Sequence, residues 1–310
     1  MNNRRQFIVN MTMAAGAITV LKPFKSFAGL GEPFYLNRNK LILLHTANLN
    51  GQRRSLAANE KYAGLGGIEN LSAKINAIRN ENIPVLLVDA GNIISQAGSD
   101  KEHLQFYKAV SRLNYDLITP GKTDLQKGGP HFYQMVKETG LKVAEPYSQS
   151  KLIYDNILPY QILNKGNLQV AVIDAGSNSL KRLNNPRNGV NAINKTAALL
   201  KEKINCVLTV CLLQEDLLKT EAYANTSSGI DIFVSTITCH SIFNTKILRN
   251  KNNREVMISF AGSRGTMMNR IDIEYSNTMD KVNVKSKLEL IGVNDDQYTA
   301  SIKKYDLYNA

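Results

Sequence analysis

Short apolar runs alternate with segments of helical periodicity along this chain, and no other feature of the sequence restricts its fold as much. Each run is four or five residues long and mostly apolar; the runs cover residues 41–44, 85–88, 170–173, 206–210 and 230–234. Such runs are typical of strands buried on both faces, as in a sheet covered by helices. Between them, apolar residues spaced by three and four predict helices over residues 68–78 and 190–204. The pattern predicts an α/β fold.

The last third of the chain has a different pattern. Residues 256–261, 270–275 and 282–290 alternate or run apolar between Asn, Ser and Gly, which predicts antiparallel strands. Residues 295–307 are expected to form a short closing helix. No internal repeat, low-complexity segment or Gly/Pro/Ser-rich linker divides the chain. We therefore expect one large α/β domain with two sheets over residues 29–310, a length sufficient for a substantial core.

The first 28 residues have the character of an export signal. Arg4 and Arg5 form a twin-arginine pattern, and a mildly apolar run over residues 7–21 follows. That run is shorter than the roughly 20 residues a membrane-spanning helix needs, and residues 26–28 (Ser-Phe-Ala) offer a small-residue cleavage site. We expect a periplasmic or otherwise exported protein that uses the twin-arginine route, with an ordinary secretory signal as the alternative. No later segment is apolar enough to span a membrane.

The charge balance excludes one class of partner. The chain carries a net charge of +12, and four of those positive charges lie in the expected signal, which leaves +8 for the remainder. Its Lys and Arg residues are scattered singly among acids, without the basic block of a nucleic-acid-binding arm. We interpret them mostly as a solvated basic surface, and no nucleic-acid partner is expected.

Five stretches at the ends of the expected strands carry polar and glycine residues in a fixed order. They are His45-Thr46-Ala47-Asn48-Leu49-Asn50-Gly51, Val88-Asp89-Ala90-Gly91-Asn92, Tyr115-Asp116 with Gly121-Lys122-Thr123-Asp124-Leu125, Val207 to Val210 with Cys211-Leu212, and Gly229-Ile230-Asp231 with Ser235-Thr236-Ile237-Thr238-Cys239. In order and spacing, from about Leu41 to Ile273, they resemble the signatures of the metallophosphoesterase (calcineurin-like) domain of the 5′-nucleotidase family. The resemblance implies a two-sheet sandwich flanked by helices. Members of that family commonly carry a C-terminal nucleotide-binding domain, and this chain stops near where it would begin.

The same resemblance assigns the metal-site positions. The family ligands are aspartate, histidine, aspartate, asparagine and three histidines. The matching positions here hold Asn48, Asn50, Asn92, Lys122, Leu212, Ile237 and Cys239. The catalytic histidine and aspartate of the third signature correspond to Thr123 and Gln126.

These replacements argue against two-metal catalysis. Two adjacent dications need carboxylates and neutral imidazoles to offset their charge, whereas Lys122 would place an ammonium group among the ligands. We therefore expect no catalytic residues, no metal and no cofactor, although the family would use two divalent metals. Two alternatives remain open: a one-residue shift would bring His240 to the last ligand position, and His45 lies near the first loop. His45 is expected instead to form a hydrogen bond at the end of its strand.

Lys122 suggests two further hypotheses. With the amides of Asn48, Asn50 and Asn92 it could bind a phosphate-like anion without metal, because all these groups donate hydrogen bonds. Alternatively, it forms a salt bridge with Asp89 or Asp124 and closes an unused site. Arg53 and Arg54, just after the first loop, could add to an anion site or simply face solvent.

The three cysteines lead to a separate prediction. Cys211 and Cys239 are placed by the family resemblance at strand ends on one rim, where a disulfide across the site could form. Cys206 is expected to be a buried core thiol on the opposite face of its strand from Cys211.

Three functions follow as hypotheses. The first is an exported, catalytically inactive relative that acts as a binding or partner subunit, alongside a separately encoded C-terminal nucleotidase domain or another envelope protein. The second is a metal-free binder of phosphate-like anions. The third is a metal-dependent phosphoesterase with a rebuilt metal site that hydrolyses phosphate esters.

Overall fold

The computed structural model describes residues 39–143, 157–176, 186–238 and 245–292. The chain divides into Met1–Arg38 and Asn39–Ala310, and all described residues belong to the second unit. The expected signal peptide and the expected helix at 295–307 lie outside the described residues.

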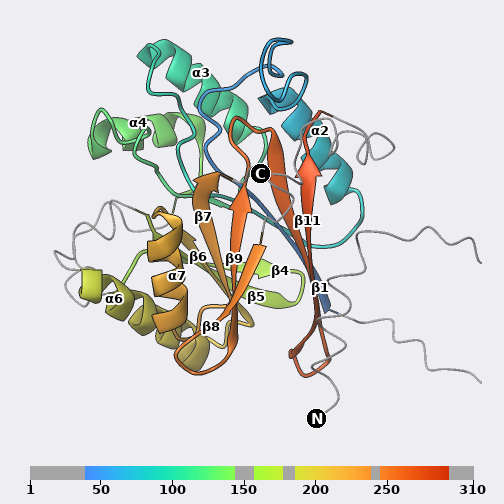
Figure 1. Cartoon of the computed structure of the whole chain (residues 1–310), viewed down its shortest axis with the longest axis vertical. Coiled ribbons are helices and arrows are strands. Elements are labelled where there is room, and N and C mark those ends of the chain that lie inside the picture. Colours follow the sequence, from blue (N-terminus) through green and yellow to red (C-terminus); the bar gives the residue numbers. More distant parts are fainter. Residues whose placement is uncertain (1–38, 144–156, 177–185, 239–244, 293–310) are drawn as a thin grey trace, which may run out of the picture. The chain divides into compact units, whose positions relative to one another are not determined.

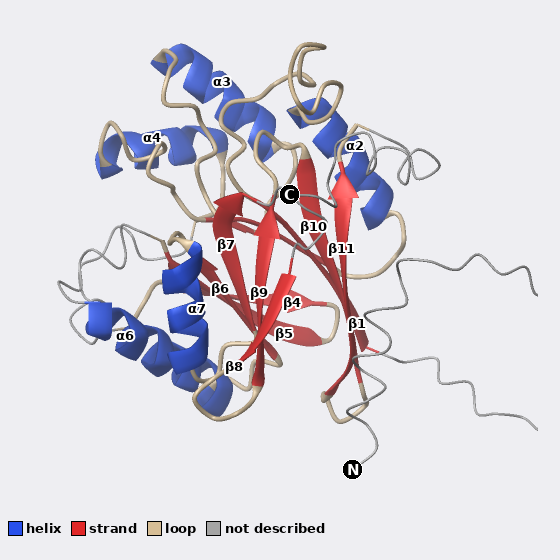
Figure 2. Ribbon diagram, in the orientation of Figure 1, coloured by secondary structure: helices blue, strands red, loops and turns tan. Residues whose placement is uncertain are grey.

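Two β-sheets make up the centre of the second unit (Figures 1 and 2). The first has the order β11-β10-β1-β2-β3, with β11 at Lys281–Leu290, β10 at Met267–Tyr275, β1 at Asn39–Thr46, β2 at Val85–Asp89 and β3 at Leu117–Ile118. The second has the order β4-β5-β6-β7-β9-β8, with β4 at Tyr160–Lys165, β5 at Leu168–Ala175, β6 at Leu208–Leu213, β7 at Ile232–Thr238, β9 at Glu255–Ala261 and β8 at Thr245–Arg249. In the first sheet β1, β2 and β3 are parallel, and β10 and β11 are joined to them by antiparallel pairing. In the second sheet β5, β6, β7 and β9 are parallel, and the edge strands β4 and β8 are antiparallel to their neighbours.

Helices flank both sheets. Those that accompany the first sheet are α2 (Ile68–Arg79), α3 (Asp100–Ser111) and α4 (Gly129–Thr139); those of the second are α6 (Pro186–Ala198), its π-helical continuation Leu199–Lys203, and α7 (Leu217–Thr226). Their boundaries follow local signals: Ser99 and Glu102 form a reciprocal capping box at the start of α3, and Gly140 ends α4 in the left-handed conformation. None of the described helices combines the length and apolar character that a membrane-spanning segment needs.

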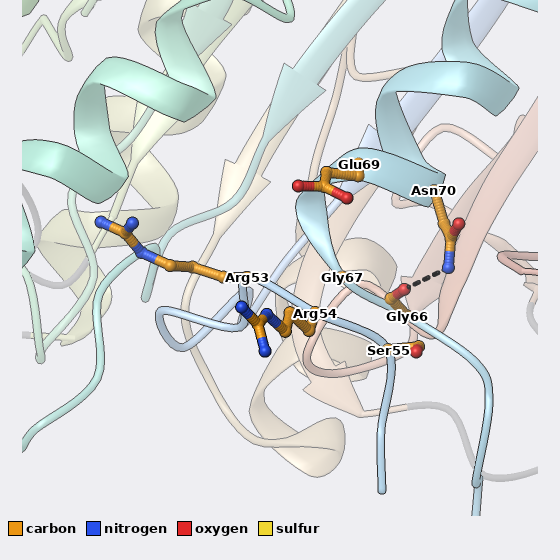
Figure 3. A pocket seen from close by; sticks show the side chains of 7 residues that line it. All are labelled: Arg53, Arg54, Ser55, Gly66, Gly67, Glu69 and Asn70. Carbon is orange, nitrogen blue, oxygen red and sulfur yellow. Dashed lines mark hydrogen bonds between the residues drawn. The ribbon is translucent and has the colours of Figure 1, made fainter.

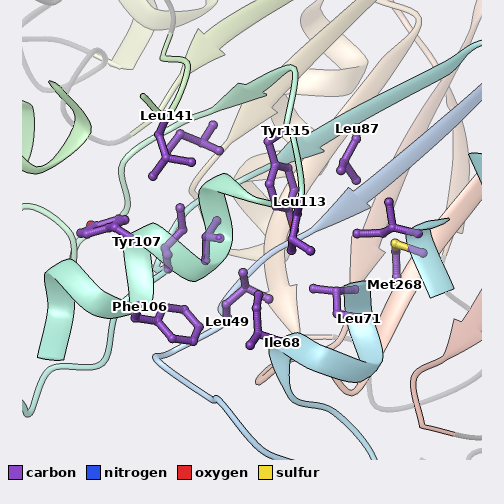
Figure 4. Packing of buried hydrophobic residues seen from close by; sticks show 14 of the residues in the cluster. Leu49, Ile68, Leu71, Leu87, Phe106, Tyr107, Leu113, Tyr115, Leu141 and Met268 are labelled. Atoms are coloured by element: carbon purple, nitrogen blue, oxygen red, sulfur yellow. The ribbon is translucent and has the colours of Figure 1, made fainter. Parts of the chain in front are cut away.

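Three layers of apolar side chains, one between the sheets and one under the helices of each sheet, explain why the strands are continuous apolar runs in the sequence. Within one strand, Leu41 and Leu43 pack between the sheets, whereas Ile42 and Leu44 pack against the helices. Figure 4 shows the layer between the first sheet and its helices, to which Leu71 of α2, Phe106 of α3 and Leu87 of β2 all belong. Because both faces of these strands are buried, most positions along them are apolar.

Most of the expected elements are confirmed. The four apolar positions of the first predicted helix are the buried residues of α2: Ile68, Leu71, Ile75 and Ile78. The second predicted helix is present, but its last turn is π-helical. β6 and β7 each begin two residues later than the apolar runs that predicted them. The sequence patterns we used did not identify β3, β4, β8, α3, α4 or α7.

One expected strand is wrong in its pairing. β9 was predicted among antiparallel strands, and it is antiparallel to β8 but parallel to β7. Its apolar run places it inside the second sheet, where it has a neighbour on each side. Apolar patterning reports burial and does not report strand direction, which explains the error.

Candidate functional site

Loops gather at one edge of the first sheet. β1, β2 and β3 are parallel, so their carboxyl ends meet at the same edge, where ligand sites commonly lie in parallel sheets. The first two loops run side by side: the backbone N–H groups of Asn48, Asn50 and Gly51 donate to the carbonyls of Gly91 (2.8 Å), Asn92 (3.0 Å) and Ile93 (2.8 Å). This pairing brings the first and second signatures into contact.

The backbone of these loops is left-handed at three asparagines. The φ angles are 53° at Asn48, 49° at Asn50 and 60° at Asn92, and asparagine adopts this region more readily than most residues. Space is also limited: a Cβ atom on Gly121 would lie 2.2 Å from the Asn92 amide oxygen. The loops are therefore packed closely enough for the side chains of Asn48 and Asn92 to meet.

An amide chain, which we define as Asn48, Asn92 and Thr123, crosses the three signatures. Asn92 Nδ2 donates to Asn48 Oδ1 at 2.8 Å. Thr123 donates to Asn92 Oδ1 through its backbone N–H at 3.1 Å and its hydroxyl at 3.2 Å. At the other end, Asn48 Nδ2 donates to the carbonyl oxygen of Thr236 in β7, at 2.6 Å. The chain thus joins the loops of the first sheet to the second sheet.

Backbone groups fix the direction of both amides. The Thr123 N–H can only donate and the Thr236 carbonyl can only accept, so Asn92 has to present its oxygen to Thr123 and Asn48 its nitrogen to Thr236. The amide–amide bond between them then has a single possible polarity. The Asn92 oxygen accepts two hydrogen bonds and the Asn48 oxygen accepts one. Each amide therefore keeps one unused N–H, and the Asn48 oxygen keeps one lone pair.

Lys122, Asn50 and Gln126 lie beside this chain in the sequence but outside its hydrogen bonds. Lys122 and Gln126 are exposed and Asn50 is half-buried. Among the described residues, no acid forms an ion pair with Lys122. The alternative salt bridge to Asp89 or Asp124 is therefore wrong: both carboxylates are buried beneath the loops and bonded to other groups.

Asp124 connects the second and third loops. It accepts hydrogen bonds from the backbone N–H groups of Gly121 (2.8 Å), Ile93 (3.0 Å) and Ile94 (3.1 Å), and from the Tyr107 hydroxyl (2.9 Å). Burial raises the pKa of Asp124, while these donors lower it and offset part of that effect. Its oxygens face protein donors, so it has a structural role.

Asp89 lies at the end of β2, beneath the first loop. It accepts from Thr46 Oγ1 at 2.5 Å and from the Gly91 N–H at 2.7 Å, and the Thr46 hydroxyl also contacts the Tyr115 hydroxyl at 2.7 Å. Complete burial raises the pKa of Asp89 to about 8, although both hydrogen bonds favour the charged form. Burial in this place therefore favours the protonated form of the carboxyl group.

The second sheet supplies apolar or amide groups to the same edge. Leu212, at a predicted ligand position, is completely buried in the core between the sheets. Ile237 belongs to β7, but its side chain lies outside the described part of the structure, as do Cys239 and His240. Gln214, which the sequence patterns did not single out, donates through Nε2 to the carbonyls of Ala90 and Pro120, both at 2.8 Å. Its only sequence signal is its position directly after the apolar run of β6.

Cys211 does not form the predicted disulfide. It is a free thiol, completely buried among the residues between the second sheet and its helices. In β6 the side chains of Val210 and Leu212 point toward the other sheet, so Cys211 points away from it. Cys206 is buried as expected, but it packs in the same cluster as Cys211 and not on the opposite face. It precedes β6, so the alternation of the strand does not extend to it.

His45 forms the expected hydrogen bond at the end of its strand. Its Nε2 lies 2.6 Å from Ser259 Oγ, and Asn269 Nδ2 donates a hydrogen bond to the same hydroxyl oxygen. Complete burial lowers the pKa of His45 to about 3, so the ring is neutral at physiological pH. Its Nδ1 has no partner among the described residues.

Arg53 and Arg54 line a different feature, a cavity of about 220 Å³ at the start of α2 (Figure 3). Its other lining residues are Ser55, Gly66, Gly67, Glu69 and Asn70. Arg53 donates to Gln105 at 3.2 Å, and Asn70 donates to the Gly66 carbonyl at 2.9 Å. No residue of the amide chain lines this cavity, so the structure does not join the two arginines to that chain.

The described residues at the expected ligand positions do not fit a two-metal centre. The amide oxygens of Asn48 and Asn92 already accept protein hydrogen bonds, and Leu212 offers no ligand atom. Within the described ranges, no group of three or more histidine, cysteine, aspartate or glutamate side chains is placed to hold a metal ion.

Comparison with known proteins identifies solved structures of similar fold. No family model and no curated protein matches the chain by sequence. Three solved structures are similar, each at 15% sequence identity. A 5′-nucleotidase precursor from Thermus thermophilus has a TM-score of 0.66, and the match covers 86% of this chain and 58% of that one. The NAD nucleotidase of Haemophilus influenzae has a TM-score of 0.64, with 85% of this chain and 55% of that one covered, and a calcineurin-like phosphoesterase from Bacillus subtilis has a TM-score of 0.61, with 87% and 97% covered.

This similarity shows the fold. The described sheets and helices have the arrangement of a calcineurin-like metallophosphoesterase sandwich, as the sequence resemblance predicted. The chain spans somewhat more than half the length of the two nucleotidases that it matches.

Asp89→Asn is expected to make stability less dependent on pH. The folded-state pKa of about 8 lies above the ordinary 3.8, so folding binds a proton between these values. Asp89 thus favours the folded state at low pH, and that contribution is lost as pH rises toward and through 8. Asparagine keeps the bond from Gly91, donates to Thr46 and cannot titrate. Urea unfolding at several pH values between 4 and 9 should show that the free energy of unfolding changes less with pH in Asp89→Asn than in the parent protein. The control variant Glu202→Gln, at an exposed position, should keep the pH dependence of the parent. The same pH dependence in all three proteins would contradict the raised pKa of Asp89.

Asn48→Asp is expected to destabilise the protein by about 1–3 kcal/mol, because a carboxylate oxygen would replace the N–H that bonds the Thr236 carbonyl. Asn50→Asp is the matched control: its backbone is left-handed too, and its side chain has no described hydrogen-bond partner. Chemical denaturation of the two variants measures the difference. Equal stabilities would show that the amide chain does not contribute to folding.

Proposed function

We propose that this protein is a catalytically silent relative of the metallophosphoesterases that acts as a binding or partner subunit. The observation that carries the proposal is the amide chain. Asn48 and Asn92 occupy two positions that the family resemblance assigns to acidic ligands, and their oxygens are used within the protein. Lys122 occupies a further position that the family resemblance assigns to a metal ligand, and it carries a positive charge.

The loss of catalysis follows from charge. A two-metal centre activates water and neutralises a developing phosphoryl charge, which requires ligands that hold two dications close together. Neutral amides, an ammonium group and the apolar Leu212 do not compensate that charge. The exposed Lys122 can instead be presented to a ligand or partner at the same edge.

The place of action is part of the proposal. The twin-arginine pattern and the apolar run after it support export to the periplasm, and the resemblance to nucleotidases supports a partner of a particular kind. We infer a separately encoded nucleotide-binding domain, or another envelope protein, as that partner. A metal-dependent phosphoesterase with a rebuilt site is the outcome that would replace this proposal.

Elemental analysis of the full exported protein, purified without chelators, tests the loss of the metal site. We expect far less than one manganese, zinc or iron ion per chain, both before and after incubation with manganese or zinc salts, and no hydrolysis of phosphate monoesters. The Bacillus subtilis phosphoesterase, handled in parallel, controls for metal loss during purification. One or two tightly held ions per chain, with phosphatase activity, would overturn the proposal.

The partner is tested by affinity purification of the exported protein from its native envelope. We expect a second polypeptide in stoichiometric amount, whose gene encodes a nucleotide-binding domain or another exported protein. A chain that purifies alone, under mild salt and without detergent, would count against a partner role. Metal content is measured on the same sample, so the two parts of the proposal are separated.

A further inference from the structure

The cavity of about 220 Å³ at the start of α2 is lined by no residue of the amide chain and has walls of its own (Figure 3). Two segments form these walls, residues 53–55 and residues 66–70. Their backbones touch, because a Cβ atom on Gly67 would lie 2.6 Å from the carbonyl carbon of Arg54. Gly67 also has a φ angle of 84°, which favours glycine. Close backbone packing therefore fixes the shape of the cavity.

The charged side chains around this cavity are two arginines and one acid. Arg53 donates a hydrogen bond to Gln105 at 3.2 Å and keeps further N–H groups, since a guanidinium group has five. The side chain of Arg54 is exposed and has no hydrogen-bond or ion-pair partner among the residues that the structure describes. Glu69 lines the same cavity, and within those residues it forms an ion pair with neither arginine. Positive charge therefore exceeds negative charge in the lining.

This balance favours a planar anion with a single charge. A guanidinium group presents its donors in a flat fork that matches the two oxygens of a carboxylate. Glu69 would repel a second negative charge, which disfavours a doubly charged phosphate group. Asn70 adds a neutral donor, because only one hydrogen of its amide is used, on the Gly66 carbonyl at 2.9 Å.

The size of the cavity agrees with such a ligand. Its volume of about 220 Å³ is several times the share of about 30 Å³ that one water molecule takes in the liquid. A carboxylate together with the few carbon atoms that carry it can therefore be accommodated.

We propose that this cavity binds a carboxylate group through Arg54, with Arg53 as a second positive charge. The carboxylate belongs either to an aspartate or glutamate side chain of another polypeptide or to a small free carboxylic acid. The first source would make the cavity a contact with the partner of the proposed function. Binding of the carboxylate itself does not depend on that function or on the absence of metal.

Calorimetric titration of the full exported protein with a capped tripeptide that has a central glutamate tests the inference. We expect saturable binding, which Arg54→Ala weakens by about ten-fold or more because a charge-assisted hydrogen bond is lost. Glu69→Gln should instead bind the peptide more tightly, since a like charge is removed, and misfolding would not produce such a gain. Arg254→Ala, which removes an exposed arginine from the turn between β8 and β9, should leave the affinity unchanged.

Two further probes distinguish the chemistry and the source of the ligand. The same peptide with glutamine in place of glutamate should not bind, because it lacks the charge. Tighter binding of the glutamate peptide than of propionate would assign the cavity to a polypeptide, and the reverse order would assign it to a free acid. Absence of saturable binding of both acids, equal binding of the glutamine peptide, or equal affinity of the parent and Arg54→Ala would overturn the inference. The silent-subunit proposal, which metal content and copurification test, would then still stand.

Discussion

The arrangement of the candidate site depends on the hydrogen bonds that buried Asp124 accepts. Three backbone N–H groups, from Gly121, Ile93 and Ile94, point at this one carboxylate, and the Tyr107 hydroxyl joins them. Turns at the end of a sheet expose backbone donors that cannot pair within a strand, and leaving them buried without acceptors would cost free energy at each. By satisfying them, Asp124 determines where the second and third loops lie, and therefore where Asn92, Lys122 and Thr123 are placed relative to one another.

The amide chain provides a second connection, between the sheets. In a two-metal enzyme, ions that take ligands from several loops also hold those loops together. Here Asn48 reaches the Thr236 carbonyl of β7, and Gln214 reaches back from the end of β6 to the Ala90 and Pro120 carbonyls. These neutral hydrogen bonds link the two sheets at the edge where the site lies. Side-chain amides therefore cross-link the two sheets at this edge.

Much of the fold could be predicted because the order of apolar and polar residues indicates which strands and helix faces are buried. Runs such as Leu41–Leu44 can be continuous only where both faces of a strand are covered, and the spacing of Ile68, Leu71, Ile75 and Ile78 matches the buried face of α2. The wrong predictions share one cause. The faces assigned to Cys206 and Cys211, and the salt bridge assigned to Lys122, could be predicted only if the direction of each side chain was known. That direction depends on where a strand begins and on which donors already surround a carboxylate.

By itself, the sequence determined the fold class, the positions of the site loops and the identity of the groups at their tips, because these follow from local pattern and from spacing along the chain. Only the tertiary structure decided what those groups do to one another. Asn48, Asn92, Thr123 and Thr236 are separated by up to 188 residues, and no local rule states that their amides bond in series with a single polarity. That polarity comes from two backbone groups at the ends of the chain of hydrogen bonds, one able only to donate and the other only to accept, which the packing of two sheets brings within reach.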